Sequence, residues 1–153
     1  MKTQLYILSV FLFAAITASS QGLDPVEWRF TSKKLDNQTY EVRISAEMEY
    51  PWHIYSQYTE DGGPVPTTIA FKGNPGVKFE GDPKEEGSLI EKYEEVFMVD
   101  TRYFEGMVDF VQVVQLENGS DRPVTLEGSV TFMACTDQQC LLPQEVEFNV
   151  KLN

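Results

Sequence analysis

The stretch Tyr40-Glu41-Val42-Arg43-Ile44-Ser45-Ala46-Glu47-Met48 alternates apolar and polar side chains without a break. A period of two places alternate side chains on opposite faces of a β-strand, so one face is predicted to be buried. Residues 124–134 and 146–152 repeat the pattern. No segment after residue 20 keeps an apolar period of 3.6 residues for three turns. The sequence therefore predicts a chain that is β throughout.

Shorter strand candidates lie between these stretches, separated by turn-forming groups such as Gly73-Asn74-Pro75-Gly76 and Gly81-Asp82-Pro83. About eight short strands in roughly 130 residues are typical of two packed antiparallel sheets. We predict an all-β, immunoglobulin-like antiparallel β-sandwich that forms a single domain. The shorter candidates are residues 26–30, 52–58, 67–71, 77–79 and 107–116.

The composition excludes several classes of protein. The 153 residues hold 24 Asp and Glu against 12 Lys and Arg, which gives a formal net charge of −12. Such a chain would be repelled by a phosphate backbone, so we expect no nucleic-acid partner. The hydrophobic share of 42% is enough to build a core, which argues against general disorder.

The first 20 residues have the features of a signal peptide. Lys2 provides a positive charge, an apolar run extends over residues 5–16, and the small residues Ala18 and Ser20 precede a predicted cleavage site. We assign residues 1–20 to the signal peptide and residues 21–153 to the exported domain. After cleavage we expect a periplasmic or otherwise exported protein, not inserted in a membrane, in a compartment where disulfides form.

The only two cysteines, Cys135 and Cys140, lie near the C-terminus with four residues between them. In the chain-entropy model, closing a loop of about 6 residues stabilises a fold by roughly 2 kcal/mol, against nearly 5 for about 100. A short crosslink does little as a staple, but it keeps two sulfurs together for thiol–disulfide exchange. The spacing alone favours a structural clip over a redox pair. A metal site with His53 and Met133 or Asp137 is a third interpretation.

Two polar residues bear on this pair. Asp137 lies between the cysteines, where a carboxylate would raise a thiol pKa, although a turn residue explains it equally well. His53 is the only histidine, and we interpret it as a hydrogen-bonded or solvated surface residue in preference to a proton donor. The sequence contains no hydrolase nucleophile motif and no glycine-rich phosphate loop.

The C-terminal run FMACTDQQCLLPQEVEFNVKL, residues 132–152, resembles the closing segment of a known domain. That domain is the N-terminal periplasmic domain of the thiol:disulfide interchange protein DsbD. The matching elements are the segments 52–56 and 93–97 together with Cys135, Cys140, Pro143 and Glu145. The best-known members space their cysteines one residue further apart.

The resemblance implies an immunoglobulin-like sandwich that passes electrons from a thioredoxin-like partner to periplasmic thiol proteins. Carried over, Cys140 would form the mixed disulfide and Cys135 would resolve it. In the family a loop with an aromatic tip shields the pair, and Val96 with Phe97 matches that cap; without the resemblance, Phe97 is predicted to be a core residue. The other candidates for the cap or the partner-binding surface are Glu94, Glu95, His53, Tyr55, Asp137 and Pro143.

We therefore expect an exported thiol:disulfide exchange domain that uses the Cys135–Cys140 pair as an electron relay. It would be a component of the protein-disulfide reductase type and not a small-molecule enzyme, with no cofactor and no metal. Its partners would be thioredoxin-like proteins and periplasmic clients, and its electrons would come from a separate protein. The alternative is a non-catalytic exported binding or adhesion module with a structural disulfide.

Overall fold

The computed structural model describes residues 23–95, 97–117 and 123–152. The predicted signal peptide lies outside these residues. Nine strands in two sheets make up the described chain, which confirms the all-β sandwich; about eight had been expected. None of the described segments forms a helix with the length and apolar character needed to cross a membrane.

The larger sheet is built around one long strand, β6. On one side of β6, β2 pairs with its second half and β3 with its first half, while β5 pairs along its other side. Every pairing is antiparallel, and β1 and β8 extend the sheet beyond β2 and β3. The strands are β1 (Val26–Lys34), β2 (Thr39–Met48), β3 (His53–Tyr55), β5 (Val77–Glu94), β6 (Val99–Leu116) and β8 (Ala134–Cys135).

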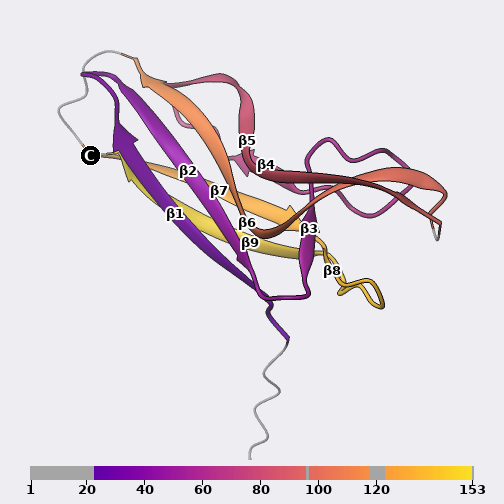
Figure 1. The fold of residues 1–153 in the computed structure, drawn as a ribbon. Helices are drawn as coiled ribbons and strands as arrows, with labels where there is room; N and C mark the ends of the chain where they lie inside the picture. The colour runs from indigo at the N-terminus through magenta and orange to yellow at the C-terminus, as the bar shows by residue number, and fades with distance from the viewer. Residues whose placement is uncertain (1–22, 96, 118–122, 153) are drawn as a thin grey trace, which may run out of the picture.

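The smaller sheet has the order β4-β7-β9, with β4 at Thr68–Phe71, β7 at Val124–Phe132 and β9 at Gln144–Leu152. The chain passes from this sheet to the larger one at Met133, between β7 and β8. The long hairpin of β5 and β6 extends past the sandwich at the end where β3 and β8 lie (Figure 1).

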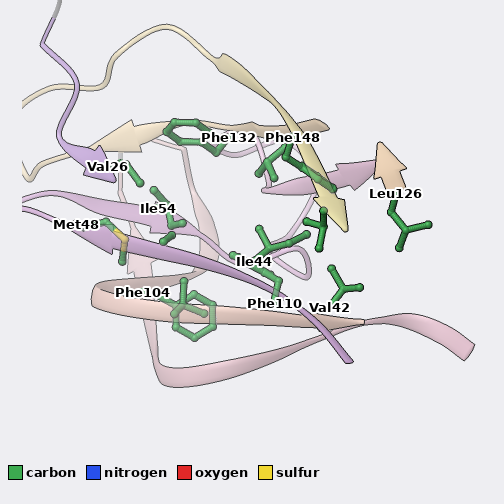
Figure 2. Close-up of a cluster of buried hydrophobic side chains, with 14 of the residues drawn as sticks. Val26, Val42, Ile44, Met48, Ile54, Phe104, Phe110, Leu126, Phe132 and Phe148 are labelled. Carbon is green, nitrogen blue, oxygen red and sulfur yellow. The ribbon is translucent and has the colours of Figure 1, made fainter. Parts of the chain in front are cut away.

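The main core fills the space between the two sheets. The alternation in residues 40–48 buries Val42, Ile44 and Ala46 completely, as predicted. Side chains of the larger sheet, such as Ile44, meet Phe132 and Phe148 of the smaller sheet (Figure 2). Burying apolar area from both sheets stabilises the sandwich by roughly 25 cal/mol per Å².

An irregularity in β6 separates this core from a second buried cluster. Gly106 has a φ of +72°, which glycine adopts at little cost, and the pairing with β5 shifts register between Gly87 and Leu89. Beyond this point Phe104 still belongs to the main core, whereas Tyr103 belongs to the second cluster. At Tyr103 and Phe104 both faces of β6 are therefore buried.

The long β5–β6 hairpin differs from the sequence prediction. The sequence predicts a strand at residues 107–116, but β6 begins at Val99. The predicted strand is too short because the bulge interrupts the alternation of apolar and polar residues. Gly81-Asp82-Pro83 was predicted to be a turn, but it lies inside β5, where the register shifts between Glu80 and Lys84. Pro83 is tolerated because β5 pairs only with β6 and is an edge strand. An N–H group on the outer side of an edge strand has no partner strand, so its absence costs no hydrogen bond of the sheet.

Candidate functional site

The two cysteines form a disulfide at the end of the larger sheet, with the sulfurs 2.03 Å apart. Cys135 lies in strand β8, although the strands predicted at residues 124–134 and 146–152 leave it between them, and it pairs with Cys140 as an isolated antiparallel bridge. A tight turn over residues 136–139 joins them. Thr136 N donates to Gln139 O at 2.7 Å, and the Thr136 hydroxyl accepts from the N–H groups of Gln138 and Gln139.

The two sulfur-bearing residues differ in exposure. Cys135 has no solvent-accessible surface, because it lies within the second buried cluster. Cys140 is exposed, and so are Leu142 and Pro143, which follow it. A reactant from outside can therefore reach the disulfide only on the Cys140 side.

Aromatic side chains surround the buried cysteine. Tyr55 and Tyr103 share its cluster, and the partly buried Ile90 and Met133 pack against it. The sheet register explains the grouping. Tyr55 lies opposite Tyr103 in the pairing of β3 with β6, and the side chains of directly opposite residues lie on the same face of the sheet. The alternation of β3 places Ile54 on the opposite face, in the main core.

His53 lies directly opposite Cys135 in the pairing of β3 with β8. Only 4% of its surface is exposed, so the prediction of a surface histidine is wrong. Its Nε2 atom lies 3.2 Å from the Tyr55 hydroxyl, and its ring centroid lies 4.5 Å from that of Tyr103. The sequence did not indicate this burial, because the burial depends on β8, which lies 81–82 residues further along the chain.

Burial also governs the titration of these groups. It lowers the pKa of His53, since desolvation disfavours the charged ring, and nearby carboxylates oppose that shift only in part. Burial raises the pKa of Tyr55 to about 12, and the carboxylate of Glu94 adds to the effect. Burial likewise raises the pKa of Tyr103. At neutral pH both tyrosines therefore keep their protons.

Charged residues lie at the rim of this cluster. Lys92 Nζ is 3.3 Å from a carboxylate oxygen of Glu94 and 3.4 Å from one of Asp137. The second ion pair ties the turn between the cysteines to β5. The charges of the two carboxylates also act on the pKa values of Tyr55 and His53, so both carboxylates lie near the aromatic cluster.

The structure brings some of the predicted site residues together and leaves others apart. His53, Tyr55, Glu94 and Asp137 surround the disulfide as described above. Glu95 and Pro143 are exposed. Phe97 is half-buried between β5 and β6 and lies close to Gly63. Val96 lies outside the described residues.

Sequence reasoning missed Tyr103 and Lys92. Tyr103 precedes the strand predicted at residues 107–116, and only an alternation continued back through Thr101 would have indicated it. Lys92 was hidden among the acidic residues of a segment without apolar alternation. Within the described residues, no group of three His, Cys, Asp or Glu residues is placed to hold a metal ion.

Comparisons with known proteins place these features in context. The family described as thiol:disulfide interchange protein DsbD, N-terminal, matches residues 20–152. The structure is similar to the DsbD N-terminal domain of Neisseria meningitidis in the reduced form, with a TM-score of 0.50 and 14% identity over 82% of this chain and 86% of that one.

A chain from the complex between the DsbD N-terminal and PilB N-terminal domains of Neisseria meningitidis is also similar. Its TM-score is 0.51 and its identity 14%, over 83% of this chain and 85% of that one. At this identity the two structures show the shared fold. No curated protein matches the sequence.

Proposed function

Because the chain belongs to the family of the N-terminal domain of the thiol:disulfide interchange protein DsbD, we propose that it is a thiol–disulfide exchange domain. Cys135 and Cys140 are its redox pair. It passes reducing equivalents from a thioredoxin-like donor to exported client proteins. Residues 1–20 are removed as a signal peptide, and the domain of residues 21–153 works in the periplasm or another exported compartment.

The unequal exposure of the two cysteines is the observation that carries this proposal. Cys140 is exposed while Cys135 is completely buried. Exchange needs one sulfur that an external thiolate can attack and a second that remains nearby to resolve the mixed disulfide. A structural clip requires no such difference, and a loop of about 6 residues stabilises the fold by only about 2 kcal/mol.

The exchange proceeds in two displacements. A donor thiolate attacks Sγ of Cys140, the Cys135–Cys140 bond breaks, and Cys135 leaves as a thiolate. The second donor thiol then attacks the donor sulfur of the mixed disulfide and releases Cys140, so two electrons have moved to the domain. The reduced pair transfers them to a client disulfide by the same steps in reverse.

The surroundings of the disulfide suit a protein partner. Exposed Leu142 and Pro143 follow Cys140 and offer an apolar contact beside the reactive sulfur. A DsbD N-terminal domain forms a complex with the PilB N-terminal domain in Neisseria meningitidis, which supports a protein as the partner. We assign Glu95 and Phe97, between β5 and β6, to the cap that a partner displaces, and we include Val96 because of the family resemblance.

The carboxylates of Glu94 and Asp137 restrain the reduced pair. A negative charge nearby raises a thiol pKa and lowers the thiolate fraction, so reaction with unrelated disulfides is slowed until a partner docks. Lys92 offsets part of this effect, since it pairs with both carboxylates.

Trapping of a mixed disulfide tests the proposal. We expect Cys135→Ser to accumulate a covalent complex with a reducible thioredoxin-like protein through Cys140, because the resolving sulfur is absent. Cys140→Ser is the matched control and should give no complex, because its remaining thiol is buried. Equal trapping by both variants, or by neither, would favour the binding module with a structural disulfide.

A further inference from the structure

We propose that His53, held by Tyr55, accepts and returns the proton of Cys135 during thiol–disulfide exchange. This inference rests on the proposed function and adds the group that handles the proton. Such a group is needed because Cys135 alternates between a disulfide sulfur, a thiolate and a thiol inside a cluster from which solvent is excluded. A buried thiolate without a proton source is costly.

The sheet register brings the two side chains to the same face. His53 and Cys135 are direct partners in the antiparallel pairing of β3 with β8, and such partners have Cβ atoms about 4.5–5.5 Å apart. The His53 ring packs against Tyr103, which belongs to the same buried cluster as Cys135. The ring is therefore held next to the buried sulfur.

Tyr55 fixes which nitrogen of the ring can act. The Tyr55 hydroxyl lies 3.2 Å from Nε2, the one hydrogen bond of this ring within the described part of the chain. Nδ1 is then the nitrogen available for proton transfer. When Nε2–H donates to the Tyr55 oxygen, Nδ1 carries the lone pair that a proton acceptor needs.

The other titratable groups around the ring are less suited to this role. On β3 and β6, Tyr55 and Tyr103 have raised pKa values and keep their protons at neutral pH. The carboxylates lie at the exposed rim and Lys92 is bound in ion pairs, whereas His53 is buried. The rim groups facing the ring are Glu94 and Lys92 of β5, Glu105 of β6 and Asp137 of the cysteine turn.

The pKa of His53 fits a proton acceptor. Burial lowers it from the ordinary value of 6.5, so the ring is neutral at pH 7 and ready to take a proton. Lys92 supports this shift, while Glu105, Asp137 and Glu94 oppose it.

The proton and electron balance follows from this arrangement. In the resolving step the Cys135 thiol gives its proton to Nδ1 of His53. The thiolate attacks Sγ of Cys140 in the mixed disulfide, the Cys135–Cys140 bond forms, and the partner sulfur leaves with the electron pair. The imidazolium then passes its proton to solvent. In the opposite direction Nδ1 of His53 takes a proton from solvent, and Cys135, which leaves as a thiolate, receives that proton from the imidazolium.

The reaction of the reduced protein with 5,5′-dithiobis(2-nitrobenzoate) isolates this step. Cys140 reacts first and releases one thionitrobenzoate, and the attack by Cys135 then releases the second. We expect the rate of the second release to rise with pH up to an inflection below pH 6.5 and then to level off. In His53→Gln it should rise without a plateau and be about a hundredfold slower at pH 7.

A second pair of variants distinguishes the loss of proton transfer from a loss of the fold. Tyr55→Phe should move the inflection and slow the second release severalfold. The matched control Tyr40→Phe, in the main core, should change neither. Urea unfolding of each variant identifies molecules that have lost the fold.

The outcomes separate this inference from the proposed function. If the wild type releases both equivalents and His53→Gln keeps the same pH profile and rate, the role of His53 is wrong while exchange stands. If the wild type releases no second equivalent, both proposals fail.

Discussion

The main core and the disulfide cluster both take side chains from β3, β6 and β8, but their composition suits different roles. In β3, Ile54 points into the main core while Tyr55 points into the disulfide cluster, and in β6 Phe104 and Tyr103 divide in the same way. The main core is large and consists mostly of aliphatic and phenylalanine side chains, with Tyr40, Met48 and Trp52 among them. The disulfide cluster is small, and its aromatic groups carry polar atoms.

The difference shows how the fold separates stability from chemistry. The main core gains its stability from apolar area and packing, which does not depend on the state of the cysteines. In the proposed exchange, the disulfide cluster buries a bond that breaks and reforms, together with a histidine that takes up and releases a proton. Because successive side chains of a strand point to opposite faces, one strand contributes residues to both the main core and the disulfide cluster.

The largest expected effect comes from the main core. Phe132 is fully buried and its ring centroid lies 5.0 Å from that of Trp28, so Phe132→Ala should destabilise the domain by about 3–5 kcal/mol. Urea unfolding measures the loss. The rate at which glutathione reduces the disulfide under native conditions should hardly change, and a large change in that rate would contradict the separation of the two regions.

Reduction of the disulfide should have a smaller effect. Opening a loop of about 6 residues lowers the free energy of unfolding by about 2 kcal/mol in the chain-entropy model. Urea unfolding with and without dithiothreitol gives this difference. A reduced domain that fails to fold would show that the disulfide is a staple and not an exchangeable bond.

The pH dependence of stability comes next. Because the pKa of His53 is lowered in the folded state, the unfolded state binds more protons between that pKa and 6.5. The His53 contribution to stability is therefore complete above pH 6.5 and is lost as the pH falls through this window. Urea unfolding at pH 5 and 7 should show a smaller fall for His53→Gln than for the wild type, and an equal or larger fall would contradict the burial argument.

The smallest effect is expected at the charged rim. Lys92→Met removes two ion pairs between exposed or half-buried groups and should change stability by about 0.5 kcal/mol or less. It should also raise the pKa of His53, which NMR titration measures, because Lys92 lowers that pKa. Lys72→Met removes comparable pairs on the smaller sheet and is the matched control. An unchanged His53 pKa would show that the rim does not act on the ring.

The sequence predicted the parts of this molecule that depend on local pattern. Alternation in residues 40–48 and 146–152 located β2 and β9, because each has one buried face. It located only the start of β5, at residues 77–79, because no side chain of that strand is fully buried, and it located β6 only after the bulge around Gly106. The lengths of β5 and β6 could therefore not be predicted from the sequence.

The candidate site shows the same limit. The cysteine pair follows from spacing and from the family resemblance, but the unequal exposure of its members depends on the pairing of β8 with β3. The same pairing buries His53. Contacts between segments so far apart leave no periodic signal in the sequence. The position of His53 opposite Cys135 could therefore not be predicted.

The reduction potential of the Cys135–Cys140 pair tests the central claim most directly. Equilibration of the wild-type protein with glutathione or dithiothreitol buffers, followed by thiol quantification, gives this value. We expect a potential in the range of exchange proteins, from about −120 to −270 mV. A potential below about −300 mV, with a disulfide that resists these reductants in the folded state, would identify a structural bond and contradict the account.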